Sequence, residues 1–331
     1  MMADTSKKIS ELRQDLVCGD WVVIAVGRGK RPHAFSGAPA TFEEPREMCP
    51  FENFSGSDAP QPVLQSGSVS VIPNKFPAFA KGVCRVFSKE GPYTFADGVG
   101  IHEVFVLKDH ARYIPELSLE EMSDLIRAYR DRYKTVSREE CIAYVLIFHN
   151  HGREAGASIA HPHSQLVAMP VIPPDVARSV EGSKRYFREH GKCVHCEMVQ
   201  YELVSKKRLV DENEKFVAFT PFASKIAFET RIFPKVHQSV FEMLEDGDVT
   251  LLAEILQRSV ARLKKGLNDP AYNFFIHTAP VGDVSRYDHY HWHIEILPKT
   301  SVWAGVEIGT GIEISAIMPE EAAEFLRNIT V

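Results

Sequence analysis

The same order of expected elements occurs twice along this chain of 331 residues. In each half an apolar, β-branched segment ends in a histidine, and an amphipathic helical segment follows. A second apolar strand then leads through a loop to a strand with a His-x-His pattern. The separation from His110 to His161 in the first half is nearly that from His237 to His291 in the second. A match of several elements in order is harder to obtain by chance than a short motif, so we interpret it as an internal duplication.

Each unit of this duplication has three expected strands and one expected helix. In the first unit the strands are residues 101–110, 141–150 and 160–170, and the helix is 118–134. In the second unit the strands are 227–237, 271–278 and 289–299, and the helix is 248–265. Ser118 and Glu121 form a capping box at the start of the first helix. A Pro-containing, charged stretch at 171–192 separates the units, so we divide the chain into halves 1–175 and 176–331. Strands predominate, and their order predicts an α+β fold with antiparallel sheets and a helix packed on each.

The composition limits the classes of partner. The chain is 44% hydrophobic and 25% charged, with a formal net charge of −6, which argues against a general nucleic-acid or acidic-membrane partner. No run of about 18 apolar residues predicts a transmembrane helix, and the polar N-terminus lacks the apolar stretch of a signal peptide. Six cysteines in a chain of this length do not suggest a secreted disulfide framework. We therefore expect a cytoplasmic protein.

The segment AHPHSQLVAMP, residues 160–170, carries the most informative pattern. Alternate residues of a strand face one side, so His161, His163 and Gln165 form a row. Pro162 cannot donate to a strand ladder, which places this segment at an edge or at the start of a strand, where a ligand can approach. The alternative is that the histidines are core residues whose nitrogens are bonded to backbone carbonyls.

The loop before this row favours the ligand-binding interpretation. The sequence NHGREAGAS has small residues, including Gly152 and Gly156, that let backbone N–H groups approach phosphate oxygens, and Arg153 adds a cation. A neutral imidazole beside a bound phosphate can attack phosphorus and divide one transfer into two steps. The pattern therefore favours a histidine nucleophile.

This combination resembles the galactose-1-phosphate uridylyltransferase family of the histidine-triad superfamily, whose nucleophile motif is His-Pro-His-x-Gln after a Gly/Ser loop. The resemblance covers nearly the whole chain. It implies duplicated histidine-triad-like domains with half-barrel antiparallel sheets, a homodimer, and a nucleotide sugar and a hexose 1-phosphate or phosphate as substrates. Other segments that match are GDWVVIAVGRGKRP, CPFENFSG, VIPNKFPAF, KDHARYIPELS and HWHIEILPK.

The resemblance assigns roles to individual residues. His163 attacks the α-phosphorus of a UDP-sugar, forming a nucleotidyl-histidine, and Gln165 hydrogen-bonds the transferring phosphoryl group. A second hexose 1-phosphate then attacks this intermediate, in ping-pong fashion. The residues that the resemblance places near the substrates are Arg28, Arg31, Asn74, Phe76, Asn150, Gly156 and Ser158, with Gly309, Thr310 and Gly311 where other members contact the hexose phosphate.

Two metal sites are expected, with zinc as the metal. The family's N-terminal site uses Cys-x-x-Cys and two histidines, but here Glu replaces the second cysteine; carboxylate also ligates zinc. The alternative is that this site is empty or weak and that its cysteine is merely buried. Cys-x-x-Cys at 193–196 is a zinc half-site or a redox pair, and the βαβ setting of a redox pair is missing. The expected ligands are Cys49, Glu52, His110 and His161 in the first site, and Cys193, Cys196, His237 and His291 in the second.

The second His-x-His row continues with His293 and Glu295. Because the glycine loop precedes only the first row, we expect this half to maintain the fold and to help bind the sugar phosphate, without a second nucleophile. Lys75 replaces an acidic residue of better-known members, and the Gly-Thr-Gly stretch, which we expect to be a turn, lacks their Lys and Gln. The chain is in these respects similar to the ADP-glucose phosphorylase branch, so both the nucleobase and the acceptor stay open.

Three functions are therefore retained. The first is a UDP-glucose:hexose-1-phosphate uridylyltransferase, and the alternative is an ADP-glucose phosphorylase or adenylyltransferase. A more remote alternative is a non-catalytic, zinc-stabilised nucleotide-binding protein.

Overall fold

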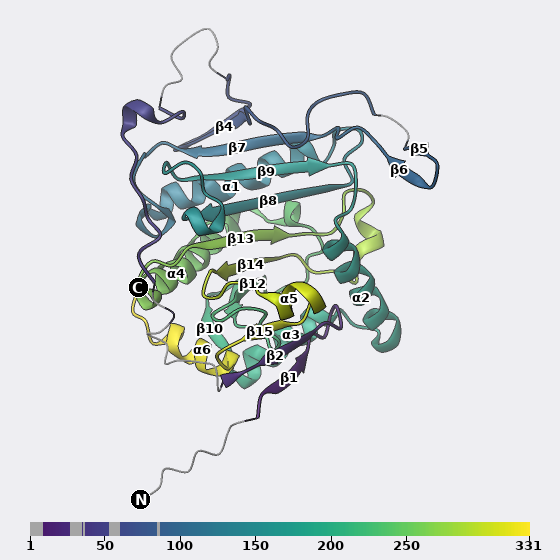
Figure 1. Ribbon diagram of the computed structural model, residues 1–331, viewed down its shortest axis with the longest axis vertical. Coiled ribbons are helices and arrows are strands. Elements are labelled where there is room, and N and C mark those ends of the chain that lie inside the picture. The colour runs from purple at the N-terminus through teal and green to yellow at the C-terminus, as the bar shows by residue number, and fades with distance from the viewer. Residues whose placement is uncertain (1–8, 27–34, 36, 53–59, 85–86) are drawn as a thin grey trace, which may run out of the picture.

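The computed structural model describes residues 9–26, 35, 37–52, 60–84 and 87–331, and one ten-stranded sheet lies at its centre (Figure 1). All strand pairs in this sheet are antiparallel, as the element order predicts. In spatial order the strands are β10 (Leu209–Glu212), β11 (Phe216–Phe219), β12 (Thr230–Pro234), β14 (His293–Pro298), β13 (Tyr272–His277), β8 (Tyr144–His151), β9 (His163–Met169), β7 (Ile101–Leu107), β4 (Val69–Pro73) and β3 (Leu64–Ser66).

The sheet confirms the internal duplication. Outward from the pair β8–β13, one half has the order β8, β9, β7, β4, β3 and the other has β13, β14, β12, β11, β10. These are equivalent orders, because in each half the last two strands along the chain exchange places in space. The halves therefore share one continuous sheet, joined where Asn150 of β8 pairs with Asn273 of β13.

One long helix from each half covers the back of the sheet. Helices α1 (Leu119–Val136) and α4 (Val249–Leu267) contribute apolar side chains to the main hydrophobic core, and α1 lies behind β8 and β9 in Figure 1. The predicted capping box is confirmed, since Glu121 N–H donates to Ser118 Oγ at 3.2 Å and Ser118 N–H donates to Glu121 Oε2 at 2.8 Å. Two amphipathic helices on one face leave the front face of the sheet for other elements.

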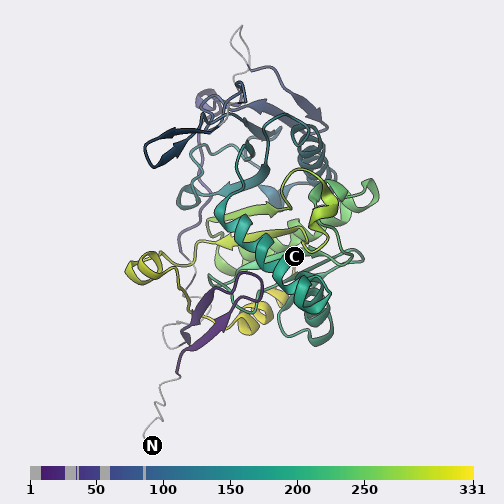
Figure 2. The same cartoon turned by 90° about the vertical axis from the view of Figure 1, so that its right-hand side faces the viewer.

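The front of the sheet is covered mainly over the second half. Helix α3 (Val194–Ser205) packs against β10, β11 and β12 through a separate apolar cluster. A small sheet consists of β1 (Glu11–Gln14), β2 (Trp21–Ile24) and β15 (Glu313–Ser315), and β15 runs parallel to β2, a pairing that the sequence did not predict. The remaining elements are β5 (Ser88–Glu90), β6 (Tyr93–Phe95), α2 (Pro174–His190), α5 (Gly305–Thr310) and α6 (Pro319–Arg327); α5, in yellow, projects from the body in Figure 2.

The fold class is α+β, as predicted. Within the described ranges, no helix is both long and apolar enough to cross a bilayer. Cys84 and Cys141 form a disulfide with their Cα atoms 5.7 Å apart, which the sequence did not indicate. The cysteines of the two expected metal sites are free of disulfides.

Candidate active site and metal centres

Side chains alternate along β9 between the two faces of the sheet. Ser164 and Leu166 face the helices, where Leu166 lies in the main core. His163 and Gln165 therefore face the front, and the two sides of the strand separate packing from chemistry. The structure places His161 just before the strand and brings His161, His163 and Gln165 together on this front face.

One of the two ring nitrogens of His163 has a hydrogen-bond partner. Its Nδ1–H donates to the carbonyl oxygen of His161 at 2.9 Å, and the ring of Phe51 packs edge-on with centroids 5.2 Å apart. Burial lowers the pKa of His163 below its usual value, so the ring is neutral at pH 7. A neutral imidazole with its proton on Nδ1 has a lone pair on Nε2, which is the atom that a nucleophile requires.

The loop between β8 and β9 depends on two glycines. Gly152 has φ +82° and Gly156 has φ +93°, in the left-handed range that glycine tolerates. A Cβ on Gly152 would lie 2.7 Å from Cβ of Ala40 and 2.9 Å from Cβ of Ala271, so the space is also closed to a side chain. Gly156 and Ser158, both expected near the phosphates, are exposed to solvent and leave the loop open to a ligand.

Asn150, the last predicted residue of this group, is fixed by the second half of the chain. Asn273 Nδ2–H donates to Asn150 Oδ1 at 2.8 Å and to the carbonyl oxygen of Ala155 at 2.8 Å. The Nδ2 atom of Asn150 lies 3.5 Å from the position that a Cβ on Gly156 would occupy. The second half thus supports both the amide and the loop, a role for Asn273 that sequence reasoning missed.

Gln165 meets another residue that the sequence analysis missed, His102 on β7. His102 Nε2 lies 2.8 Å from Gln165 Oε1 and 3.1 Å from Asn74 Nδ2. In the same turn, Phe76 N–H donates to Asn74 Oδ1 at 2.8 Å, and the ring of Phe76 is 82% exposed. Asn74 and Phe76 are therefore brought to the edge of the His163 site, where the exposed Phe76 offers an aromatic surface for a base and Lys75 Nζ lies 5.8 Å from the ring centroid.

Five of the predicted substrate residues are not brought to His163 by the described structure. Arg28 and Arg31 lie outside the described residues. Gly309, Thr310 and Gly311 were expected as a turn, but Gly309 and Thr310 form the end of α5 and Gly311 is its left-handed cap with φ +69°. Figure 1 shows α5 over the second half of the sheet, beside β15 and away from β9. The helix forms because its first turn is capped by Glu307, whose carboxylate accepts from Ala304 N–H at 3.0 Å.

The first cluster of metal-ligand side chains lies directly before β9. Cys49, His110 and His161 have possible ligand atoms within 4.8 Å of one another. His161 Nε2–H donates to the Leu107 carbonyl at 2.6 Å, and His110 Nε2–H donates to the Glu44 carbonyl at 2.9 Å. Both rings therefore have a lone pair on Nδ1, and these two nitrogens face each other at 3.2 Å.

Facing lone pairs repel unless a cation lies between them, which fits a metal centre. Cys49 Sγ is 3.5 Å from Nδ1 of His161, and burial raises the pKa of its thiol. Glu52 Oε1 lies 3.4 Å from Nδ1 of His110 and 3.8 Å from Nδ1 of His161. Two imidazoles, a sulfur and a carboxylate are a donor set that zinc accepts.

The second cluster joins the start of α3 to the second half of the sheet. Cys193, Cys196, His237 and His291 also have possible ligand atoms within 4.8 Å of one another. Cys196 Sγ is 3.3 Å from His237 Nδ1 and 3.5 Å from His291 Nδ1. Hydrogen bonding from Cys196, His237 and His291 outweighs burial and lowers the pKa of Cys193, which favours the thiolate form that a metal binds. This donor set also fits zinc.

The second His-x-His row has the same backbone relation as the first. His293 Nδ1–H donates to the His291 carbonyl at 3.2 Å. However, the ring of His293 is packed among three aromatic rings, with centroid distances of 4.7 Å to Phe233, 5.0 Å to His277 and 5.4 Å to His195 of α3. Rings therefore surround this imidazole, where the first row has an open loop.

Charged side chains complete the second row. Arg231 lies 3.0 Å from Glu295 and 2.8 Å from Glu229. His277 Nε2 is 2.9 Å from the other oxygen of Glu295. Burial opposes the charge of Glu295, but Arg231 and His277 hold its pKa well below the usual value. Arg231, the cation available to a phosphate here, is already neutralised by carboxylates.

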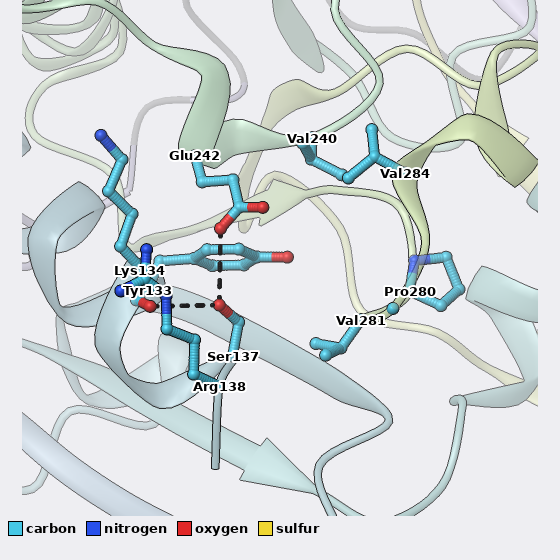
Figure 3. Close-up of a pocket in the computed structure, with 10 residues that line it drawn as sticks. Tyr133, Lys134, Ser137, Arg138, Val240, Glu242, Pro280, Val281 and Val284 are labelled. Carbon is cyan, nitrogen blue, oxygen red and sulfur yellow. Dashed lines mark hydrogen bonds between the residues drawn. The ribbon is translucent and has the colours of Figure 1, made fainter.

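A cavity of about 480 Å³ lies away from the first row (Figure 3). It is bordered by the C-terminal end of α1 and the loop after β13, and Tyr133 and Glu242 are among its lining residues. Val281 of its wall donates its N–H to the Ala143 carbonyl, just before β8 begins, whereas His163 lies near the other end of β8. The cavity is therefore separate from the candidate active site.

The fold and the first row define a nucleotidyltransferase built from two matching halves. The sequence profile of the galactose-1-phosphate uridyl transferase N-terminal domain matches residues 1–173, and that of a domain of unknown function matches residues 105–329. The chain belongs to the galactose-1-phosphate uridylyltransferase family.

Two relatives and one solved structure show how this chain compares within the family. ADP-glucose phosphorylase of Arabidopsis thaliana is 33% identical over 97% of this chain and 93% of its own length. Galactose-1-phosphate uridylyltransferase of Thermotoga maritima is 28% identical over 97% of this chain and 99% of its own. The crystal structure of the Arabidopsis phosphorylase with bound ADP-glucose superposes with a TM-score of 0.81 at 32% identity, covering 98% of this chain and 100% of that one.

Proposed function

We propose that the protein transfers a nucleoside monophosphate from a nucleotide sugar through a covalent nucleotidyl-His163. In the first step, Nε2 of His163 attacks the α-phosphorus, the bond to the β-phosphate oxygen breaks, and hexose 1-phosphate leaves. In the second step, a phosphate oxygen of the acceptor attacks the same phosphorus and the P–N bond breaks. The observation that carries this proposal is the 2.9 Å bond from Nδ1–H of His163 to the His161 carbonyl, which leaves the Nε2 lone pair on the front face.

The preferred substrates are UDP-glucose and a hexose 1-phosphate, as in the uridylyltransferases of this family. The alternative pair is ADP-glucose and phosphate, which is supported by the 33% identity to the plant ADP-glucose phosphorylase across 97% of this chain. In both cases we assign the base to Asn74 and Phe76 and the phosphates to Asn150, Gly156 and Ser158.

We further propose that zinc occupies both cysteine–histidine clusters. In the first cluster, Cys49, Glu52, His110 and His161 would hold the ion, and a bond to His161 would fix the backbone whose carbonyl accepts from His163. In the second, Cys193, Cys196, His237 and His291 would tie α3 to β12 and β14. Both ions are structural, since every proposed coordination position is filled by a side chain.

A homodimer is also proposed, with Arg28, Arg31 and Gly309–Gly311 as the residues whose roles depend on it. The helix α5 leaves large apolar side chains exposed, among them Val306 at 52% and Ile308 at 74%. Exposed apolar side chains on a projecting helix support contact with another protein surface.

The test is to incubate the purified protein separately with UDP-glucose and with ADP-glucose, each labelled at the α-phosphorus. We expect protein-bound label that is stable to base and labile to acid, as a phosphoramidate is, together with release of glucose 1-phosphate. A chase with phosphate or with galactose 1-phosphate then identifies the acceptor. If neither nucleotide sugar labels the protein although it binds, the protein is a non-catalytic nucleotide-binding protein.

A further inference from the structure

The amide of Gln165 has two chemically different ends. Its oxygen only accepts hydrogen bonds, and its nitrogen only donates them. The oxygens of a phosphoryl group in transfer carry negative charge, so only the nitrogen end stabilises them. The direction of this amide is therefore as important as its position, and its neighbours decide that direction.

His102 determines the direction of the Gln165 amide through the position of its own ring proton. The backbone N–H of Ala78 donates to His102 Nδ1 at 3.0 Å, so this nitrogen carries a lone pair. The proton of the neutral ring is then on Nε2, which faces Gln165 Oε1 at 2.8 Å. The other neighbour of this nitrogen, Asn74 Nδ2 at 3.1 Å, has no lone pair to offer. The Nε2–H of His102 therefore donates to the oxygen end of Gln165.

We infer that His102 is a positioning residue that fixes the amide of Gln165 with its NH2 group toward the phosphoryl group on His163. The inference rests on the proposed function of His163. Gln165 and His163 share one face of β9, and Gln165 stands opposite Val104, two residues after His102 on β7. His102 also holds the turn at Ala78, so one ring connects the proposed base site with the proposed phosphoryl site.

Two substitutions separate these two contacts of His102. In H102N, the amide oxygen occupies a position like that of Nδ1 and still accepts from Ala78 N–H, but nothing reaches Gln165. In H102Q, the longer amide reaches the position of Nε2 and can donate to Gln165. H190L is the control, because His190 is an exposed histidine at the end of α2, remote from the site.

The measurement is the single-turnover rate of protein labelling by the α-labelled nucleotide sugar, with the steady-state kcat and KM. We expect H102N to lower the labelling rate and kcat about 10-fold with little change in KM. This loss is smaller than the loss of about 10²–10³-fold for removal of a donor, because Gln165 itself is still present in H102N. H102Q should recover at least half of the wild-type rate, and H190L should retain all of it. A merely structural role of His102 predicts no difference between H102N and H102Q.

A double-mutant cycle with Q165A completes the test. If His102 acts through Gln165, H102N should have no further effect in the Q165A background. Equal losses in the two backgrounds, or unchanged kinetics of H102N, would overturn the inference while leaving the nucleophile in place. Absence of label in the wild type would instead overturn the proposed function, so the two failures are distinguishable. If H102N does not fold, the H102Q and H102Q/Q165A variants give the same comparison, and an H102Q rate below a tenth of wild type contradicts the inference.

Discussion

His163 and His293 stand at equivalent places in the two halves of the sheet, and each donates Nδ1–H to the carbonyl two residues earlier. Their surroundings differ. Beside His163 are neutral amides and a loop with two left-handed glycines. Beside His293 are Arg231 and carboxylates, which neutralise one another. The comparison teaches that the His-x-His backbone is common to both halves, and that the groups around it decide whether a phosphate can bind.

The second half also has a direct part in the first site. Asn273 supports Asn150 and the loop, and Asp269 accepts from Thr41 N–H at 2.9 Å and lies 3.0 Å from His151 Nε2. The second half thus supports the site of the first half through direct hydrogen bonds. Matched substitutions in the two halves test this division of roles.

The largest effect is expected from removing each imidazole in turn. H163N and H293N are matched, because the amide nitrogen of Asn can still donate to the preceding carbonyl while Nε2 is lost. H163N should lower the rate of nucleotidyl transfer by at least about 10³-fold, since a covalent nucleophile is removed. H293N should stay within a few-fold of wild type in the same turnover assay. Equal losses in the two variants would contradict the division.

Substitutions of the residues two positions after the two histidines, Gln165 and Glu295, should have the next largest effect. Q165E replaces a donor near the phosphoryl oxygens with a negative charge, so we expect a loss of about 10²–10³-fold or more in rate. E295Q removes a partner of buried Arg231 and should instead lower the free energy of unfolding, by about 3 kcal/mol. Rates and denaturant unfolding curves of both variants give the comparison, and a Q165E enzyme of normal rate would argue against the role of Gln165.

Loss of the first metal cluster should lower activity more than loss of the second. C49S should lower both zinc content and activity, because His161 of that cluster accepts the hydrogen bond of His163. C193S should lower zinc content and the unfolding temperature, with most of the activity retained in protein that stays folded. Elemental analysis beside an activity assay tests this. If the wild type holds no zinc when purified without chelators, both assignments are wrong, and full zinc in C193S removes the second alone.

The smallest effect concerns the contact between the halves at Asp269. Although burial opposes it, hydrogen bonds from His151 and Thr41 lower the pKa of Asp269 to about 2. A lowered pKa stabilises the folded state above the unfolded pKa, so this contribution, about 2 kcal/mol, is present above pH 4 and is lost as the pH falls toward 2. D269N should therefore be less stable than wild type at pH 7, and the difference should shrink below pH 4. Asn tolerates the positive φ of this position, 54°, so backbone strain is not the cause. A difference that is independent of pH would contradict this account.

The sequence predicts the elements of this fold well, because each has a local signal. The capping box at Ser118 and the helical spacing of apolar residues are read within one segment, and the repeated order reveals the duplication. Contacts between strands have no such signal. His102 lies 63 positions before Gln165, and Asn273 lies 123 positions after Asn150, so neither partnership is visible along the chain. The Gly-Thr-Gly stretch was misjudged because Gly311 also serves as a helix cap, a use that its sequence does not distinguish from a turn.

The central claim is that covalent chemistry occurs in the first half alone, and peptide mapping of the labelled protein tests it most directly. The protein is incubated with α-labelled UDP-glucose or ADP-glucose, digested at mildly basic pH to preserve a phosphoramidate, and analysed by mass spectrometry. The account predicts one nucleotide per chain, attached to His163. A nucleotide on His293, or labelling that persists in H163N, would contradict it.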